Sequence, residues 1–365
     1  MKKALGFIKN EIVLVISFVL ALASCFLVTP NRGYIDYIDF RTLALLFCLM
    51  AVTAGLNGMG VFRILAEKLL KYVKSFSALS FALCMLCFFS SMLITNDVAL
   101  ITFVPFTLIL LNMINKKEKA IILVTLETVA ANLGSMATPI GNPQNLYLFS
   151  RYEMSMSEFF SAILPYAFLS FVLTAIFSLF TGKDRIRINT EKTEFRFDKN
   201  IVVYSVLFVL ALLSVFRIVN YVVLLVISVA AVLIFDRKTL KRVDYSLLLT
   251  FVFLFVFIGN LGRIPAVSTF LKEIVAGREV AVGIISSQIF SNVPAAILLS
   301  NFTDNVKDLL VGVNLGGLGT LIASMASLIS FKLIQKEKVN SGKYIFVFTL
   351  VNVTFLLFNL LFTLV

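Results

Sequence analysis

The sequence is dominated by long apolar segments without charged residues, separated by short charged stretches. A helix of about 20 apolar residues crosses the ~30 Å hydrocarbon core of a bilayer. Of the 365 residues, 60% are hydrophobic and 14% are charged, whereas a soluble domain usually carries about 25% charged residues. We therefore expect an all-α polytopic membrane protein.

We expect the hydrophobic segments to form eleven elements, with approximate bounds 11–28, 42–58, 77–114, 120–150, 157–180, 201–218, 219–235, 246–260, 280–302, 308–333 and 344–364. The segments 77–114 and 280–302 are interpreted as helical hairpins that return to the side from which they start. With this arrangement and a cytoplasmic N-terminus, most of the 32 Lys and Arg residues fall in the cytoplasm, as the positive-inside rule requires. A multi-pass protein of the cell membrane is expected.

Several other classes of protein are excluded by composition. The chain has no His, which removes imidazole metal sites and His-based proton relays. Its net charge of +12 comes from loops between apolar segments, so nucleic-acid binding is not expected. Neither a Gly-x-Ser-x-Gly elbow nor a catalytic pair is visible, so we expect no enzyme activity. Four cysteines lie within apolar stretches and are interpreted as buried helix residues: Cys25, Cys48, Cys84 and Cys87. No cofactor is expected apart from a coupling ion.

An internal repeat divides the chain. Residues 132–145 align without gaps on residues 314–327, at an offset of 182, with Asn, Leu, Gly, Thr and Ile recurring in place. A polar break precedes each copy. We expect a first inverted repeat over 1–180, a cytoplasmic linker over 181–200 and a second inverted repeat over 201–365. The charge pattern orients the halves oppositely, and inverted repeats with hairpins and broken helices are typical of secondary transporters.

The breaks contain the candidate binding residues. Taken alone, Pro139, Gly141 and Pro143 fit a turn between two spans equally well, but corresponding breaks in both halves favour a central site. Asn96 and Asn292 are interpreted as helix starts, since Asn is a preferred N-cap. The positive ends of two such helices suit an anion. Amides and hydroxyls supply further contacts, from Thr138, Asn142, Gln144, Asn145, Thr320, Ser324 and Ser327. Unwound carbonyls near Gly141 and Ala323 suit a small cation such as Na⁺.

Two carboxylates lie within apolar elements. Asp97 is at the tip of the first hairpin, and Glu127 lies within 120–150. Acids inside a membrane are functional by default, although a capping role for Asp97 and a helix-to-helix hydrogen bond from protonated Glu127 are the structural alternatives. An acid beside an anion site requires a cation between them. Asp97 therefore indicates cation coupling, or else a cationic or neutral cargo.

Two motifs carry a family resemblance over most of the chain. Thr-Pro-Ile-Gly-Asn-Pro-Gln-Asn at 138–145 resembles the Gly-Thr-Pro-Pro-Asn-like loop of a broken helix, and Ser-Asn-Val at 291–293 resembles the Ser-Asn-Thr hairpin tip of dicarboxylate symporters. The sequence is similar to the ion-transporter superfamily of divalent-anion:sodium symporters, citrate permeases, arsenite permeases and NhaD-type sodium/proton antiporters. The resemblance implies an elevator mechanism, in which hairpins and broken helices form a transport domain that slides against a dimeric scaffold.

The resemblance also implies two half-sites for cation and substrate. The first contains Asn96, Gly141, Asn142 and Asn145, and the second contains Asn292, Thr320, Ala323 and Ser324. Asp97 and Val293 stand at hairpin-tip positions where dicarboxylate symporters have a hydroxyl, and both are expected to face the substrate. With these departures the sequence is more similar to the arsenite-permease and NhaD branch. The expected function is Na⁺- or H⁺-coupled transport of a small anion, a carboxylate or an oxyanion, with sodium/proton antiport as the alternative.

Overall fold

The computed structural model describes residues 11–62, 64, 73–182, 184–186, 200–337 and 339–363. Within these ranges the chain is helical, and its only β-pairing is an isolated bridge between Ser75 and Arg185. Six helices are long and apolar enough to cross a membrane: α3 (Phe40–Gly58), α5 (Phe76–Ile94), α6 (Asn96–Met113), α9 (Met156–Leu179), α12 (Tyr245–Gly262) and α18 (Ser341–Thr363). The expectation of an all-α polytopic membrane protein is confirmed.

The shorter helices complete the fold. They are α2 (Ile12–Leu27), α7 (Ala120–Ser135), α8 (Pro143–Arg151), α10 (Asn200–Val215), α11 (Tyr221–Phe235), α13 (Pro265–Val275), α14 (Glu279–Phe290), α15 (Asn292–Leu299), α16 (Val306–Leu315) and α17 (Met325–Gln335). Each of the eleven expected elements falls on one or two helices. Helix α13 was not expected, because it is only 11 residues long and contains Lys272 and Glu273.

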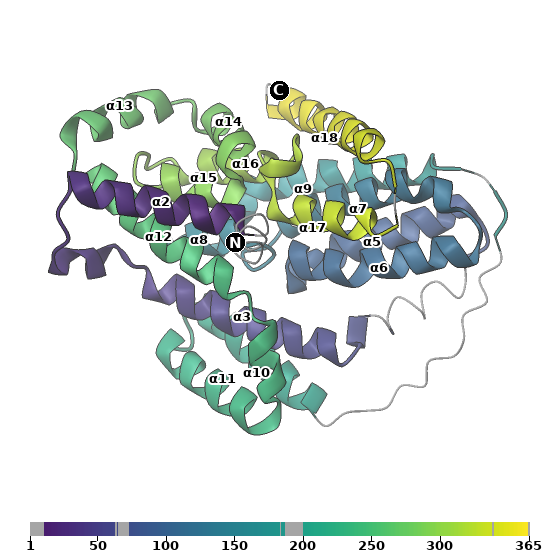
Figure 1. Ribbon diagram of the computed structural model, residues 1–365, viewed down its shortest axis with the longest axis horizontal. Coiled ribbons are helices and arrows are strands. Elements are labelled where there is room, and N and C mark those ends of the chain that lie inside the picture. Colours follow the sequence, from purple (N-terminus) through teal and green to yellow (C-terminus); the bar gives the residue numbers. More distant parts are fainter. Residues whose placement is uncertain are drawn as a thin grey trace, which may run out of the picture.

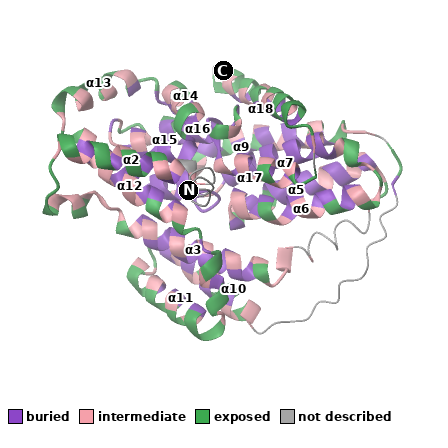
Figure 2. Ribbon diagram, viewed as in Figure 1, coloured by how far each residue is buried: buried purple, intermediate pink, exposed green. Residues whose placement is uncertain are grey.

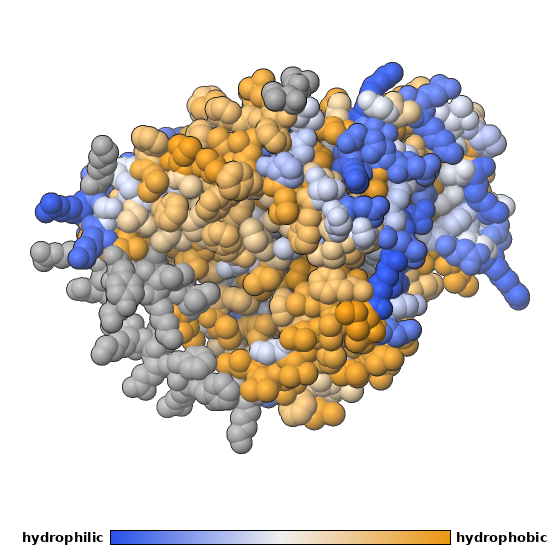
Figure 3. Space-filling view, turned by 180° about the vertical axis from the view of Figure 1, so that it is seen from behind, coloured by the Kyte–Doolittle hydropathy of each residue, from blue (hydrophilic) through white to orange (hydrophobic). Residues whose placement is uncertain are grey.

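Helix α7 is almost completely buried. All its residues except Ile122 are buried, and it packs between α5, α6 and α9. Figure 2 shows buried residues concentrated in these inner helices, whereas α11, α13 and α18 carry many exposed residues at the periphery. From behind, the surface is a broad apolar band with hydrophilic residues gathered toward its two ends (Figure 3). Such a band matches the hydrocarbon layer of a bilayer.

Two helix pairs reverse at a single residue. Thr95 separates α5 from α6 with φ 71° and ψ 151°, and Ser291 separates α14 from α15 with φ 73° and ψ 154°. This region of backbone space is unfavourable for residues other than Gly. The breaks fall where the sequence predicted them, but the capping assignment was wrong by one residue. Thr95 and Ser291 occupy the N-cap position, and Asn96 and Asn292 are the first helical residues.

Two other helices are interrupted by longer irregular segments. Residues 136–142 separate α7 from α8, and residues 316–324 separate α16 from α17. Asn142 caps α8 by accepting a hydrogen bond from the Asn145 N–H at 2.9 Å. The segment 120–150 thus contains two α-helices and an irregular stretch, and the segment 308–333 contains two α-helices separated by a stretch that includes the 3-10 turn η4 (Leu321–Ala323). The relation of the two halves as inverted repeats remains a prediction.

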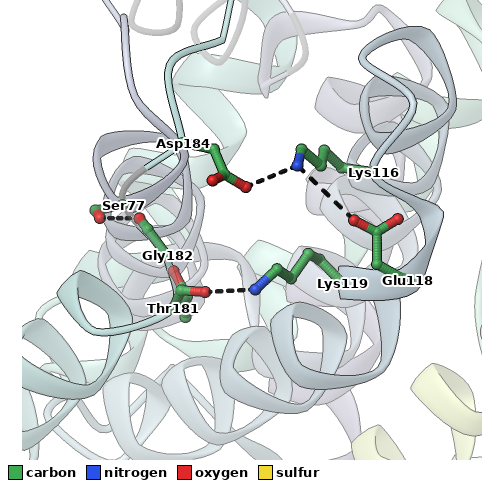
Figure 4. Close-up of polar contacts among 7 residues, drawn as sticks. All are labelled: Ser77, Lys116, Glu118, Lys119, Thr181, Gly182 and Asp184. Carbon is green, nitrogen blue, oxygen red and sulfur yellow. Dashed lines mark hydrogen bonds and ion pairs between the residues drawn. The ribbon is translucent and has the colours of Figure 1, made fainter.

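Polar contacts fasten the segment after α9 to neighbouring loops (Figure 4). Lys116 Nζ lies 2.7 Å from Asp184 Oδ2, and Lys119 Nζ donates to the Thr181 carbonyl at 3.0 Å. The Ser77 hydroxyl donates to the Gly182 carbonyl. Most of the predicted linker 181–200, and the predicted cytoplasmic residues 1–10, lie outside the described residues.

The Lys116–Asp184 pair predicts a small pH-dependent contribution to stability. The hydrogen bond and positive charge of Lys116 lower the pKa of Asp184, so the stabilisation is present above the ordinary Asp pKa and is lost as the pH falls through the lowered one. We expect Asp184→Asn to lower the melting temperature slightly at about pH 7, as exposed pairs do, and to have no effect once the pH is below the lowered pKa of Asp184. Thermal unfolding over this range measures the effect. Lys116→Gln should reproduce it, and a larger loss at low pH would contradict the assignment.

Candidate substrate site where four helices are interrupted

The tip of the first hairpin is bound to the first break. Asn96 is 4% exposed, and its Nδ2 donates to Asn132 Oδ1 on α7 at 3.0 Å. Its backbone N–H donates to the Gly141 carbonyl at 3.2 Å, and its Oδ1 accepts from the Asp97 N–H at 3.0 Å. Two of these bonds thus hold the start of α6, one to α7 and one to the break that follows it, and the third lies within α6.

The unwound carbonyls of the first break are satisfied by an amide. Asn145 Nδ2 lies 3.1 Å from the Met136 carbonyl and 3.0 Å from the Thr138 carbonyl. Gly141 passes so close to the end of α7 that an added Cβ would lie 2.1 Å from the Ser135 carbonyl oxygen. Only glycine fits there without moving the backbone. The carbonyls keep further lone pairs, as the predicted cation site at Gly141 requires.

The second break has an equivalent arrangement. Gln288 Nε2 on α14 donates to the Gly316 and Leu318 carbonyls, each at 2.9 Å. Its Oε1 accepts from the Thr320 N–H at 3.0 Å. The Ser291 hydroxyl lies 3.5 Å from the Ala323 carbonyl, which occupies the position that Gly141 holds in the first half. The sequence interpretation missed Gln288, because nothing in its immediate neighbours marks it.

The two breaks exchange side-chain hydrogen bonds reciprocally. Asn132 in the first half accepts from Ser324 at 3.1 Å and donates to Ser327 at 3.3 Å. Asn314 in the second half accepts from Asn142 at 3.0 Å and donates to Asn145 at 2.7 Å. With the offset of 182, these are the same two contacts with the halves interchanged. A two-fold relation between two similar units produces such a reciprocal pattern.

We call these six residues, Asn132, Asn142, Asn145, Asn314, Ser324 and Ser327, the amide cluster. All are at most 5% exposed. Of the predicted substrate residues, Asn142, Asn145 and Ser324 belong to it, and Asn96 is bonded to it. Asn132 and Asn314 were not selected from the sequence. Their signal was present, because they are the first matching pair of the repeat.

The remaining predicted residues of the second half lie differently. Asn292 is 4% exposed, and its Oδ1 accepts from the Val293 N–H at 3.0 Å, as Asn96 does with Asp97. The Val293 side chain is part of the hydrophobic core. Thr320 is exposed, and its described hydrogen bond goes to Gln288. The structure therefore brings Asn292 to the break, but it places Thr320 at the surface and Val293 among apolar side chains.

Asp97 faces a small cavity. The cavity has a volume of about 130 Å³, and Thr95, Asp97, Asn142, Arg242 and Asp244 contribute its polar wall. Asp97 Oδ1 is buried, and no described residue donates a hydrogen bond to it. An unpartnered carboxylate oxygen is costly to bury. Asp97 is thus available to a cation or a proton within reach of the amide cluster.

Glu127 occupies a separate environment. It is fully buried on α7, and its Oε1 accepts a hydrogen bond from the Thr107 hydroxyl on α6. No described residue bonds to its Oε2. The bond to Thr107 agrees with the helix-to-helix contact considered as the structural alternative. The second oxygen leaves a proton or cation role open.

The donor set is rich in oxygen. Amides, hydroxyls, backbone carbonyls and one carboxylate surround the breaks, and the described residues contain no group of three His, Cys, Asp or Glu side chains placed to hold a metal. Carbonyl and carboxylate oxygens at unwound helices suit Na⁺. Helices α6, α8, α15 and α17 all begin at this centre, and their positive ends favour negative charge.

Comparisons with known proteins agree with a membrane carrier. A family model described as "Citrate transporter" matches residues 5–310. The chain is 37% identical to an uncharacterized transporter of Methanocaldococcus jannaschii over 85% of both chains. It is 30% identical to the inner membrane protein YbiR of Escherichia coli over 83% of this chain and 82% of that protein. The silicon efflux transporter LSI3 of Oryza sativa is 36% identical over 35% of this chain and 26% of its own length.

Proposed function

Because this chain belongs to the citrate transporter family, we propose that it is a secondary active transporter of a small anion, either a carboxylate or an oxyanion. The chain is a multi-pass membrane transporter of the citrate and arsenite permease type. Coupling to Na⁺ or H⁺ and alternating access of the elevator type complete the proposal.

The reciprocal amide cluster is the observation that carries this proposal. Polar side chains and unwound backbone are costly inside a membrane, and are tolerated where they line a cavity or a binding site. Here six buried amides and hydroxyls link both breaks. Four helices begin around them, which provides partial positive charge for an anion.

Asp97 supports the coupling step. Its unpartnered oxygen lies in a cavity that Asn142 also lines. A Na⁺ ion or proton at Asp97 would neutralise the acid and allow an anion to bind nearby. The carbonyls of Gly141 and Ala323 would complete a cation site in each half. Without a bound cation, Asp97 would repel the anion, so the cation and the anion would bind together.

An elevator mechanism also requires a moving unit and a scaffold. We assign α5–α8 and α14–α17 to the moving unit, because their breaks are bonded to one another. The remaining helices would form the scaffold of a homodimer in the cell membrane, with a cytoplasmic N-terminus. Residues 1–180 and 201–365 would be the inverted repeats, joined by the linker 181–200.

Flux into proteoliposomes tests the function. Purified protein should accumulate at least one of citrate, succinate, sulfate or arsenite against its gradient when an inward Na⁺ or H⁺ gradient is imposed. Silicate belongs in the panel, because one relative is named a silicon efflux transporter. Ligands can first be ranked by thermal shift, since binding to the folded state raises apparent stability. Absence of flux for every anion under both gradients would remove the proposal.

Truncation of the hairpin-tip amides should impair transport. Asn96→Ala removes the bonds to Asn132 and the Asp97 N–H, and Asn292→Ala removes the equivalent bond to the Val293 N–H. We expect each variant to lower flux about tenfold or more, because losing one hydrogen bond in the site costs ~1.5 kcal/mol. Membrane expression should stay normal. Asn112→Ala, at the far end of α6 and bonded to Glu337, is the matched control. Loss of expression instead would indicate a structural role.

Sodium/proton antiport is the alternative function. It is favoured by two carboxylates, Asp97 and Glu127, each with one buried oxygen to which no described residue bonds. These carboxylates would alternate between protonated and Na⁺-bound forms. We expect Asp97→Asn to abolish Na⁺-driven proton movement, because an amide cannot exchange a proton or carry the charge. A pH-sensitive dye inside proteoliposomes measures this. Unchanged antiport in Asp97→Asn would exclude the antiporter mechanism, and anion flux without net proton exchange would favour the first function.

A further inference from the structure

A large apolar cavity lies away from the amide cluster. Its volume is about 700 Å³, and α2, α12, α13, α14 and α15 contribute its walls. Apart from Ser286, the side chains that line it are apolar. Protein interiors leave few voids larger than a water molecule, and an apolar cavity does not hold ordered water. An apolar space of this size suits an apolar molecule rather than water.

Helix α13 forms the outer wall of the cavity. Apart from Pro265, its apolar side chains line the cavity: Ala266, Val267, Phe270, Leu271, Ile274 and Val275. Lys272 and Glu273, which do not line the cavity, are exposed. The helix lies at the edge of the molecule between α12 and α14 (Figure 1), and most of it is exposed or half-buried (Figure 2). This is the pattern of a helix that lies in the membrane interface with one face toward the acyl chains.

The cavity is lined by apolar side chains, and the exposed charged residues on or beside α13, none of which lines it, are three cations and Glu273. Phe270 is 61% exposed and Phe290 is 38% exposed, so the cavity opens toward hydrocarbon. Arg263, Lys272 and Arg278 are exposed on or beside α13. Arg263 donates to the Tyr37 hydroxyl at 3.2 Å, whereas neither Lys272 nor Arg278 is paired with a carboxylate in the described part of the chain.

We propose that this cavity binds an acyl chain of an anionic phospholipid, whose phosphate is held by Lys272 and Arg278. Charge complementarity selects a phospholipid over a neutral apolar molecule or an apolar helix of a second copy, since neither of these uses the two unpaired cations. Long basic side chains extend along an apolar surface and place their charge at the headgroup level. Pro294 on α15 also lines the cavity, so the bound chain contacts the hairpin two residues from Asn292. This site is distinct from the proposed substrate site and does not depend on it.

Tryptophan fluorescence provides a direct test, because the chain contains no Trp. Phe257→Trp places a single reporter on the α12 wall of the cavity, and Phe168→Trp places one on the exposed face of α9, where Phe168 is 69% exposed. Each full-length variant is reconstituted in vesicles of phosphatidylcholine and phosphatidylglycerol. The acyl chains of one lipid at a time carry bromine, which quenches a neighbouring Trp.

For Phe257→Trp, brominated phosphatidylglycerol should reach half-maximal quenching at about one-fifth of the mole fraction that brominated phosphatidylcholine requires, given the attraction of a nearby Lys or Arg for an anionic headgroup. For Phe168→Trp the two lipids should quench equally. Lys272→Gln with Arg278→Gln should remove the preference at Phe257→Trp and leave Phe168→Trp unchanged. Phe290→Trp serves as a second reporter if Phe257→Trp does not fold. No quenching by either lipid, or equal quenching by both at the cavity reporters, would overturn the proposal.

Discussion

Asn314→Leu is expected to abolish transport and to destabilise the protein. The substitution removes one of the two acceptors of Asn142 Nδ2, which keeps Ser135 Oγ at 3.1 Å, and it removes the donor to Asn145 Oδ1. Asn145 Oδ1 then has no donor among the contacts that the structure describes. Each buried polar atom left without a partner costs about 1–3 kcal/mol. Because Asn142 also caps α8, we expect the start of α8 to shift. Flux should fall by about 100-fold or more, which corresponds to an activation free energy of transport higher by ~3 kcal/mol.

Thermal unfolding in detergent and flux in proteoliposomes measure the two effects. Asn352→Leu is the matched control, because Asn352 is also a fully buried Asn within a helix, but its described side-chain bond goes to the Phe348 carbonyl of the same helix. That variant should keep both stability and transport. By the reciprocal arrangement, Asn132→Leu should resemble Asn314→Leu, since it removes the contacts to Ser324 and Ser327. Strong loss for one Asn and none for the other would contradict the reciprocal arrangement.

A double-mutant cycle separates the cluster from two independent defects. Asn314→Leu combined with Asn145→Leu removes both partners of one bond. Residues within one hydrogen-bond network show coupling of about 0.5–3 kcal/mol. The double variant should therefore be less destabilised than the sum of the single variants. Additive losses would show that Asn314 acts through some other contact.

The sequence predicted those features of the fold that depend on a single segment of the chain. Apolar length predicted the membrane helices, and polar interruptions predicted the breaks near Thr95, Gly141 and Ser291. A hairpin tip or a broken helix requires residues that tolerate an unusual backbone, and such residues are visible one position at a time. The repeat at an offset of 182 indicated which positions correspond.

The sequence did not reveal which residues meet across the breaks. The bond of Asn132 to Ser324 joins positions 192 residues apart, and only the packing of α7 against α17 brings them together. Thr320 matched Thr138 in the repeat, yet it lies at the surface. Gln288 reaches two carbonyls of the second break from α14, a role that depends on the spacing between helices. Helix α13 was missed because its apolar face is too short for a spanning segment.

Gly141→Ala is expected to disrupt the first break by displacing its main chain. The added Cβ would lie 2.1 Å from the Ser135 carbonyl oxygen and 2.8 Å from its carbon, so the main chain itself must move. Overpacking of this kind costs about 1–3 kcal/mol. The displacement also breaks the bond between the Asn96 N–H and the Gly141 carbonyl. We therefore expect a lower melting temperature together with nearly complete loss of flux.

Gly262→Ala is the matched control for this substitution. Gly262 ends α12, and an added Cβ there meets no atom within 4 Å. Alanine has a higher helix propensity than glycine by about 1 kcal/mol, so Gly262→Ala should be neutral or slightly stabilising. Fluorescence-detected thermal unfolding and anion flux compare the two variants. A Cβ at position 141 cannot come within 2.1 Å of a main-chain oxygen without moving the residues that hold Asn96. If Gly141→Ala nevertheless matches Gly262→Ala in both measurements, the close approach of the break to α7 is not required for binding.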